Sequence, residues 1–286
     1  MNRLEREASA RQTLDIVEKG LYAVNDIEVN IADSIGHSIG NTVLYSPEAL
    51  TVILEKTEKI TFSDKATVVT LTTQTVLEAL RETTNEGLTG CLNFASAKNP
   101  GGCFLSGTLA QEESLAGASS LYHSLIKCMK MYEYNRSLKT NLYSDYMIYS
   151  PGVVFIKDDE GCLLDKPYMA DVLTSPAVNV GAIKRQNPEA EELALVEQTM
   201  LARMDKVLAV FAMHNVENLV LGAWGCGVFQ NNPDDIARYF AGFLIGNGKY
   251  AKCFRKVIFS VCDQSKKQEV IKAFQKVFVA EDNLVT

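Results

Sequence analysis

Segments typical of buried strands alternate with segments that carry helical periodicity, and this alternation constrains the fold more than any other feature of the chain. Short apolar or β-branched runs predict strands at Thr67–Leu71, Leu88–Phe94, Leu219–Leu221 and Val257–Val261. Helix-forming residues predict helices at 74–81, at 111–125 with a broken continuation to 134, at 187–214, at 233–245 and at 265–278. Because crossover helices cover both faces of such a sheet, the pattern predicts one three-layer α/β domain with a mixed sheet.

Local signals add two helices and a group of short strands to this pattern. An imperfect apolar stripe predicts a helix from Leu4 that ends at Gly20. Ser46-Pro47-Glu48 offers a capping hydroxyl, a first-turn proline and a carboxylate, and so predicts the start of a second, short helix. Further along, Ser150-Pro151-Gly152 and the residues 158–161 interrupt a series of short apolar runs. These interruptions predict strands joined by tight turns.

The charge balance excludes several classes of partner. The 286 residues include 28 Lys and Arg against 35 Asp and Glu, which gives a formal net charge of −7. A chain without a basic excess is not expected to bind nucleic acid non-specifically or an anionic membrane surface. Its longest apolar stretches, such as Val207–Met213, are far shorter than the ~20 residues that span a bilayer. A phosphate-bearing ligand must therefore be held by local geometry.

The N-terminal sequence and the cysteines indicate the compartment. The first residues have alternating charges and lack the apolar core of a signal peptide, so we expect a cytoplasmic protein, or a nuclear one in a eukaryotic host. Seven cysteines without Cys-x-x-Cys spacing argue against a disulfide framework or a zinc ribbon. We expect reduced thiols, no metal, no cofactor and a monomer.

The first glycine-rich segment follows the strand that ends at Phe94 and precedes the start of a helix. Gly101 and Gly102 allow the backbone to approach a ligand or to adopt a positive φ angle. Glu112 and Glu113 fall in the first turn of the helix about 100° apart, so one can catalyse while the other orients. Each feature alone has a simpler explanation, since acidic residues complement the helix dipole and paired glycines commonly form turns.

The second glycine-rich segment, from Gly222 to Pro233, again lies between a strand and a helix. Glycines at 222, 225 and 227 can expose consecutive amides toward a pyrophosphate. The segment matches neither Gly-x-Gly-x-x-Gly nor the P-loop pattern, so neither dinucleotide hydride transfer nor ATP hydrolysis is indicated. Phe229 can pack on a sugar or a base edge, although an aromatic residue beside a loop is more often part of the core.

Together the two segments resemble those of a known family. LNFASAKNPGGCFLSGTLAQEES, residues 92–114, resembles the signature of the bacterial-type poly(ADP-ribose) glycohydrolases, a branch of the macrodomain superfamily. GAWGCGVFQNNP, residues 222–233, is similar to the diphosphate-binding loop of that family, and TLDIVEKG, LYSPE, MIYSPGVVFIKDD and TSPAVN occur in the expected order. The resemblance implies a single macrodomain-like catalytic domain over residues 1–286, with an N-terminal helical extension at 1–60 and a core at 61–286.

The resemblance also implies the residues of the catalytic half of a site. The second glutamate of the Gln-Glu-Glu motif is the acid/base residue of the family, and it corresponds to Glu113. Glu112 then hydrogen-bonds the ribose or the departing sugar, and Gln111 has a supporting role. Asn93 contacts the distal ribose, while Gly101-Gly102 lines the catalytic loop over the pyrophosphate and the ribose.

The second loop is implied to bind the diphosphate. Gly225, Cys226, Gly227 and Val228 present their backbone amides to the two phosphates. Phe229 positions the distal ribose. Preorganised amides can thus hold a pyrophosphate in an acidic protein, because hydrogen bonds of this kind act at short range.

One position departs from the family pattern, because Cys103 stands where the family has a third glycine. Its side chain can narrow the loop, forbid a positive φ, or leave binding intact while it weakens turnover. A nucleophilic role is not expected, since no histidine lies nearby in the sequence to activate the thiol.

The expected function is exo-type hydrolysis of the ribose–ribose O-glycosidic bonds of poly(ADP-ribose), with release of ADP-ribose. The expected partners are ADP-ribose and ADP-ribosylated proteins. Two alternatives stay open: a mono-ADP-ribosyl hydrolase that acts on protein or nucleic-acid adducts, and a reader that binds ADP-ribose without cutting it. The intact Gln111-Glu112-Glu113 motif favours the enzyme, because a reader has no need of a catalytic carboxyl beside the ribose.

Overall fold

The computed structural model describes residues 1–58, 65–187 and 189–279 and divides into two compact units, each built from several segments of the chain. The first unit comprises Met1–Ser46, Val76–Ser137 and Tyr146–Pro176. The second unit comprises Pro47–Thr75, Leu138–Asp145 and Ala177–Thr286. The predicted boundary between residues 60 and 61 lies outside the described residues and stays a prediction.

Four strands of a mixed sheet lie in the first unit. They are β3 (Val43–Tyr45), β6 (Met147–Lys157), β7 (Leu163–Ser175) and β5 (Thr89–Phe94), in that order across the sheet. β3 and β7 run antiparallel to β6, whereas β5 runs parallel to β7 with Asn93 opposite Thr174. Every residue of β5 except its last is buried. Asn93 is therefore still fully buried, and the chain leaves the core only at Phe94 and the loop that follows.

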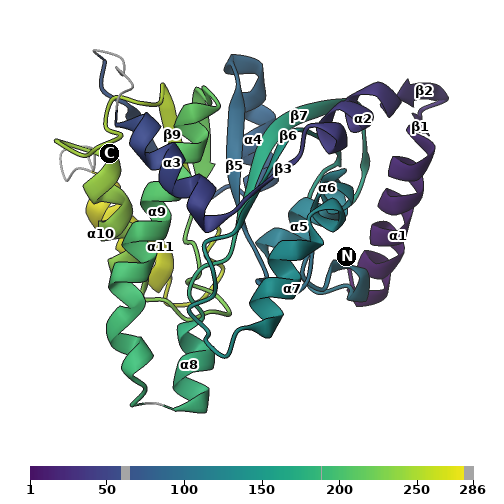
Figure 1. Ribbon diagram of the computed structural model, residues 1–286. Coiled ribbons are helices and arrows are strands. Elements are labelled where there is room, and N and C mark those ends of the chain that lie inside the picture. The colour runs from purple at the N-terminus through teal and green to yellow at the C-terminus, as the bar shows by residue number, and fades with distance from the viewer. Residues whose placement is uncertain (59–64, 188, 280–286) are drawn as a thin grey trace. The chain divides into compact units, whose positions relative to one another are not determined.

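Figure 1 labels the α-helices of the first unit. They are α1 (Arg3–Lys19), α2 (Ala32–Gly40), α4 (Val76–Thr83), α5 (Gln111–Ala118), α6 (Leu121–Lys127) and α7 (Met129–Ser137), with the 3₁₀ turns η1 (Thr84–Glu86) and η2 (Phe104–Ser106). The predicted N-terminal helix is confirmed: Asn2 caps α1 by accepting a hydrogen bond from the Glu5 amide at 3.0 Å. Gly20, with φ of 71°, ends this helix in a left-handed conformation that favours glycine.

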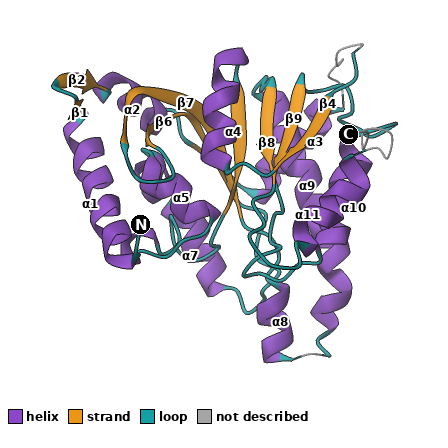
Figure 2. Cartoon of the chain, turned by 180° about the vertical axis from the view of Figure 1, so that it is seen from behind, coloured by secondary structure: helices purple, strands orange, loops and turns teal. Residues whose placement is uncertain are grey.

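Three parallel strands of the second unit have the order β8 (Asn218–Leu221), β9 (Lys256–Ser260) and β4 (Val68–Thr72) (Figure 2). Its helical elements are α3 (Pro47–Thr57), α8 (Val180–Gln186), η3 (Glu191–Leu195), α9 (Val196–Met213), α10 (Pro233–Leu244) and α11 (Glu269–Phe278). Phe259 of β9 packs against Phe240 of α10 and Phe274 of α11, and these three rings are fully buried. Among the described residues, no helix combines the length and the apolar character that a membrane span requires.

The structure differs from the sequence-based prediction in the middle of the chain. Ser150-Pro151-Gly152 is not a turn, because β6 continues through it with a shift in its register against β7. Buried Asp171 of β7 satisfies this irregular backbone: its Oδ1 accepts from the Gly152 amide at 2.7 Å, and its Oδ2 accepts from the Tyr149 hydroxyl. The second interruption is a turn as predicted, with the Gly161 amide donating to the Asp158 carbonyl at 3.1 Å.

Other boundaries also differ. The helix predicted over 111–125, with a broken continuation to 134, is the succession α5, α6 and α7. The break at Cys128 agrees with the prediction, whereas the break at Ser119 was not predicted. The helix predicted from 187 begins only with η3 and α9, and Pro188 lies outside the described residues. The hairpin of β1 (Leu21–Val24) and β2 (Ile27–Asn30) was not predicted from the sequence, nor were α2, β3 and α8.

Candidate active site

Gln111 fixes the start of α5 to the end of β5 in the first unit. Its Oε1 accepts a hydrogen bond from the Phe94 amide at 2.9 Å, and its Nε2 donates to the Leu92 carbonyl at 2.8 Å. The side-chain amide thus satisfies the backbone of β5 where the strand ends. These two bonds hold the start of α5 and place the next two residues beside the loop.

Glu112 is buried, with 3% of its surface exposed. Its Oε2 accepts from the Ser96 amide at 2.6 Å, and its Oε1 accepts from Asn93 Nδ2 at 3.3 Å. Burial raises the pKa of Glu112 to about 8, and the charge of Glu113 adds to this rise, although the hydrogen bonds from the Ser96, Asn93 and Gly101 groups oppose it. At neutral pH the carboxyl is therefore mostly protonated and can donate a hydrogen bond.

Asn93 has unused hydrogen-bonding capacity beside Glu112. Its Nδ2 also donates to Thr174 Oγ1 of β7 at 3.1 Å. Its Oδ1 is buried and has no hydrogen-bond partner among the described residues. A buried acceptor without a partner is costly, so this oxygen is well suited to a hydroxyl group of a ligand.

Glu113 faces the loop rather than the core. It is half-buried, and its Oε1 accepts from the Cys103 amide at 3.0 Å. The two neighbouring carboxylates therefore have different surroundings, which is what the 100° step of a helix requires. Glu112 is held by buried groups, whereas Glu113 lies at the surface, beside the loop that contains Cys103.

Glycine is required at position 102. Gly102 has φ of 60°, and a Cβ atom there would lie 2.3 Å from Glu113 Oε1 and 3.2 Å from Glu112 Oε2. Gly101 also has a positive φ, of 68°, and a Cβ there would lie 3.1 Å from the Phe104 ring. Cys103 has φ of −116°, which any residue adopts, and its side chain is exposed. The departure from a third glycine thus imposes no backbone strain on the loop.

The second glycine-rich loop belongs to the second unit, where it connects β8 to α10. Gly225 has φ of 76°, and a Cβ there would lie 2.5 Å from Asn231 Nδ2 and 2.6 Å from the Ala177 side chain. Asn231 closes the loop, because its Nδ2 donates to the carbonyls of Gly225 at 3.1 Å and Val178 at 2.8 Å. This loop is held in one conformation by buried contacts.

Several backbone amides of this second loop are available to a ligand. Within the described part of the chain, the amides of Gly225, Gly227 and Val228 make no hydrogen bond, and Val228 is 76% exposed. The Cys226 amide already donates to the Ala223 carbonyl at 3.0 Å. Four residues of this loop were proposed from sequence to bind phosphate. Three of them have amides that are unengaged, and the amide of the fourth, Cys226, is used within the loop.

Phe229 and the segment beside it are also fixed within the second unit. The Phe229 carbonyl accepts from the Gly181 amide at 3.0 Å, and its ring lies 6.1 Å from that of Tyr143. Asn179 caps α8 through the Ala182 amide at 2.9 Å, and its Nδ2 donates to the Tyr143 hydroxyl at 3.3 Å. The loop, the start of α8 and Tyr143 thus form one connected group.

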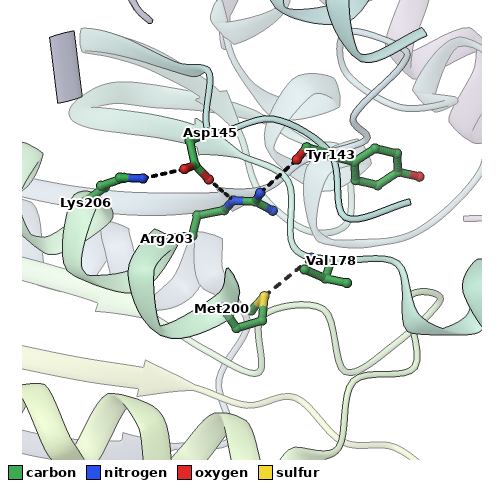
Figure 3. A network of polar contacts seen from close by, with 6 residues as sticks. All are labelled: Tyr143, Asp145, Val178, Met200, Arg203 and Lys206. Atoms are coloured by element: carbon green, nitrogen blue, oxygen red, sulfur yellow. Dashed lines mark hydrogen bonds and ion pairs between the residues drawn. The ribbon is translucent and has the colours of Figure 1, made fainter. Parts of the chain in front are cut away.

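A network of polar contacts from α9 holds the segments that contain Tyr143 and Val178 (Figure 3). Arg203 of α9 donates through Nε to Asp145 Oδ1 at 2.7 Å and through Nη2 to the Tyr143 carbonyl at 3.2 Å. Lys206 bonds the other oxygen of Asp145. Burial alone would raise the pKa of Asp145, but the charges and hydrogen bonds of Arg203 and Lys206 outweigh burial and lower it. Met200 accepts from the Val178 amide at 3.4 Å, so α9 contacts both Tyr143 and Val178.

Three residues of these sites were not identified from the sequence: Ser96, Thr174 and Asn231. Thr174 reaches Asn93 across 81 positions of the chain, and Ser96 reaches Glu112 across 16, so no local pattern indicates either contact. Asn231 lies inside the quoted loop, but an asparagine there reads equally well as a turn residue. In the described residues, no cluster of three or more His, Cys, Asp or Glu side chains could hold a metal ion.

Comparisons with solved structures confirm the predicted mixed α/β fold of the macrodomain type. The chain is 40% identical to poly(ADP-ribose) glycohydrolase from Thermomonospora curvata, with a TM-score of 0.91 over 96% of this chain and 100% of that one. The same enzyme bound to the inhibitor ADP-HPD gives 41% identity and a TM-score of 0.88, over 96% of this chain and 99% of that one. Poly(ADP-ribose) glycohydrolase from Deinococcus radiodurans in complex with ADP-ribose gives 38% identity and a TM-score of 0.81, over 86% and 97% of the chains.

Sequence comparison gives the same result. Residues 10–158, more than half of the chain, match the family described as microbial-type PARG, catalytic domain. A search of curated proteins finds no relative. The chain belongs to the microbial-type poly(ADP-ribose) glycohydrolase family.

Proposed function

We propose that the chain hydrolyses the ribose–ribose O-glycosidic bonds of poly(ADP-ribose) from the free end and releases ADP-ribose, with Glu113 as the acid/base residue. Hydrolysis of ADP-ribose polymers is the activity of the family to which the chain belongs. The observation that supports the residue assignment is the division of labour in the carboxylate pair. Glu112 is enclosed by buried partners, whereas Glu113 lies at the catalytic loop with one oxygen bonded to a backbone amide.

Glu113 acts twice in the proposed reaction. It first protonates the oxygen that leaves with the neighbouring ribose, as the bond to the anomeric carbon breaks and an oxocarbenium-like ribose forms. The resulting carboxylate then removes a proton from the incoming water, which attacks the same carbon. The Cys103 amide holds the Glu113 carboxyl at the loop during both steps.

Glu112 and Asn93 orient the ribose in this proposal. The protonated Glu112 carboxyl donates a hydrogen bond to a sugar oxygen, and the unpartnered Asn93 Oδ1 accepts from a sugar hydroxyl. Gly101 and Gly102 line the loop, and Gly102 leaves room for both carboxyl groups. Cys103 contributes its backbone amide, and Gln111 supports the helix start.

The diphosphate is proposed to bind the backbone of the second glycine-rich loop. The unengaged amides of Gly225, Gly227 and Val228 suit phosphate oxygens. The Cys226 amide donates to the Ala223 carbonyl and shapes the loop, and Phe229 packs against the distal ribose. The Deinococcus relative is in complex with ADP-ribose and the Thermomonospora relative is bound to ADP-HPD, which supports ADP-ribose as the ligand of this chain.

The cysteines support a proposal for the compartment. All seven cysteines are free thiols in the structure, as in proteins of reducing compartments. We propose a monomer that acts on ADP-ribosylated proteins in the cytoplasm, or in the nucleus of a eukaryotic host.

The deciding experiment compares wild type with Glu113→Gln on automodified poly(ADP-ribosyl)ated protein. Released ADP-ribose is resolved by chromatography, and ADP-ribose affinity is measured by calorimetry. We expect release by wild type alone, with similar affinities for both proteins, because the amide keeps the shape of the carboxyl but cannot transfer its proton. Equal losses of turnover and binding would contradict the role of Glu113.

Two other outcomes would redirect the function. If wild type binds ADP-ribose but cleaves neither polymer nor mono-ADP-ribosylated protein, the chain is a reader. If it cleaves only the mono-ADP-ribosylated protein or nucleic acid, it is a mono-ADP-ribosyl hydrolase. The size of the products from long polymers tests the exo-type action, since an exo-acting enzyme releases ADP-ribose without intermediate oligomers.

A further inference from the structure

Helix α1 holds the second half of the catalytic loop. The Ser106 carbonyl accepts from Arg3 Nε at 2.9 Å, and the Gly107 carbonyl accepts from Arg6 Nε at 2.7 Å. Gly107 has φ of 66°, and a Cβ there would lie 2.4 Å from the Arg3 carbonyl. The loop therefore passes directly against the backbone of the helix.

The helix is itself fixed to the elements around the site. Thr13 Oγ1 donates to the Gly117 carbonyl of α5 at 2.6 Å. Lys157 of β6, which is buried, donates through Nζ to the Ser9 carbonyl at 2.7 Å and to Ser9 Oγ at 2.9 Å. Ala10 packs with Phe104 of the loop. A guanidinium on this helix is thus attached to a rigid support.

A short chain of backbone hydrogen bonds links Gly107 to Glu113. The Gly107 amide donates to the Phe104 carbonyl at 3.0 Å, and the Ser106 amide donates to the Cys103 carbonyl at 2.9 Å. The Cys103 amide then donates to Glu113 Oε1 at 3.0 Å. A displacement of Gly107 is therefore passed through one 3₁₀ turn to the amide that holds the acid/base residue.

We propose that Arg6 is a positioning residue for the hydrolysis, which acts through the Gly107 carbonyl and the 3₁₀ turn to keep the Cys103 amide on Glu113. This inference rests on the proposed function of Glu113. Arg6 is half-buried, and its Nη1 also donates to the Met1 carbonyl at 2.7 Å. Arg3 contributes less, because its side chain is 70% exposed and also pairs with Glu7 at 3.4 Å.

The test separates the hydrogen bond from the bulk of the side chain. Glutamine carries its amide nitrogen at the same number of bonds from Cα as the arginine Nε, so Arg6→Gln keeps a donor for Gly107, whereas Arg6→Met keeps only the length. Arg11→Met is the matched control, because Arg11 lies on the exposed part of the same helix. The substrate is automodified poly(ADP-ribosyl)ated protein, and ADP-ribose affinity is measured on each variant.

We expect Arg6→Met to lower kcat by about tenfold or more, since a displacement of about 1 Å in a catalytic group costs up to about 10²-fold. KM and the Kd for ADP-ribose should change much less than kcat, because the amides proposed to bind the diphosphate lie in the second unit and only Gly101 and Gly102 of the proposed binding residues lie in the displaced loop. Arg6→Gln should recover most of the lost kcat, and Arg11→Met should match wild type. Hydrogen exchange of residues 101–107 should rise in Arg6→Met only.

Three results would overturn the positioning role. An unchanged kcat in Arg6→Met would show that the loop needs no such contact. Equal losses of kcat and ADP-ribose affinity in Arg6→Met would assign Arg6 to general stability. Partial unfolding of Arg6→Met would do the same if the folded fraction of Arg6→Gln were no more active than the folded fraction of Arg6→Met. If wild type releases no ADP-ribose, the proposed function fails instead, and the exchange measurement still decides whether Arg6 orders the loop.

Discussion

Gly102 determines whether both carboxyl groups fit beside the catalytic loop. We predict that Gly102→Ala lowers turnover by about 10²-fold, because the new Cβ would lie 2.3 Å from Glu113 Oε1 and must displace it. The positive φ of 60° adds strain of ~1–3 kcal/mol to the folded state. Steady-state kinetics and denaturant unfolding measure the two effects. Gly117→Ala is the control: it lies in α5 with no atom within 4 Å of its added Cβ, and it should fold and turn over normally.

A Gly102→Ala protein with normal turnover would mean that the Glu113 carboxyl does not need its position against the loop. Position 103 differs from position 102 in its backbone conformation. Cys103 has an ordinary negative φ, so the requirement for glycine ends one residue earlier than the Gly-Gly-Gly pattern suggests.

Glu112 should make the stability of the protein depend on pH. Its folded pKa of about 8 lies above the ordinary value of 4.5, so between these values the folded state binds more protons than the unfolded state. The stabilisation is therefore complete below about pH 4.5 and is lost as the pH rises to about 8, by up to about 1.4 kcal/mol per pH unit. Above that range both states are ionised, and this group changes the stability no further.

Thermal unfolding at pH 5, 6.5 and 8.5 measures this dependence. We predict that Glu112→Gln removes much of the fall in Tm across this range, whereas the exposed Glu191→Gln leaves it as in wild type. If Tm falls with pH by the same amount in all three proteins, Glu112 is ionised in the folded state at neutral pH.

At the scale of elements, the loop between β8 and α10 depends on one buried side chain. We predict that Asn231→Ala weakens ADP-ribose binding by about tenfold or more, because the loss of both Nδ2 bonds frees the carbonyls of Gly225 and Val178. The unfolding free energy should fall by ~1–3 kcal/mol. Calorimetry and denaturant unfolding provide the two values.

Asn232→Ala is a matched control for that prediction. Asn232 caps α10 by accepting from the Asp234 amide at 2.9 Å, so its loss should cost ~1 kcal/mol of stability without changing ADP-ribose affinity. If both variants weaken binding in proportion to their stability, the loop conformation is not what Asn231 provides.

The elements themselves were predicted well where local signals suffice. The helices at 3–19, 47–57 and 233–244 begin within about one residue of their predicted starts, and the helix at 269–278 begins about four residues late. The four predicted strands lie within a residue or two of β4, β5, β8 and β9. β6 was misread because proline and glycine at 151 and 152 normally end a strand, and only the contact with Asp171, 19 residues further on, allows it to continue. α2 was missed because Gly36 and Gly40 interrupt a helix of only nine residues, and the first hairpin was missed because its two strands have four residues each.

Across the whole molecule, the two glycine-rich segments belong to different units. The carboxylate pair, Asn93 and their loop belong to the first unit, and the loop from Gly222 to Asn232 belongs to the second. Motif spacing was enough to select these segments from sequence. It could not indicate the contacts that make them work, such as Asn93 with Thr174 or Arg6 with Gly107, because each joins positions more than 80 residues apart.

The order of the segments also bears on how the chain folds as a ribosome makes it. The last segment of the first unit ends at Pro176, so that unit can close while the remainder is still being translated. β4 emerges much earlier, but its neighbour β9 begins only at Lys256. The second unit therefore has a strand that stays unpaired while about 180 further residues are made, and a nascent chain of this kind depends on slow, long-range pairing.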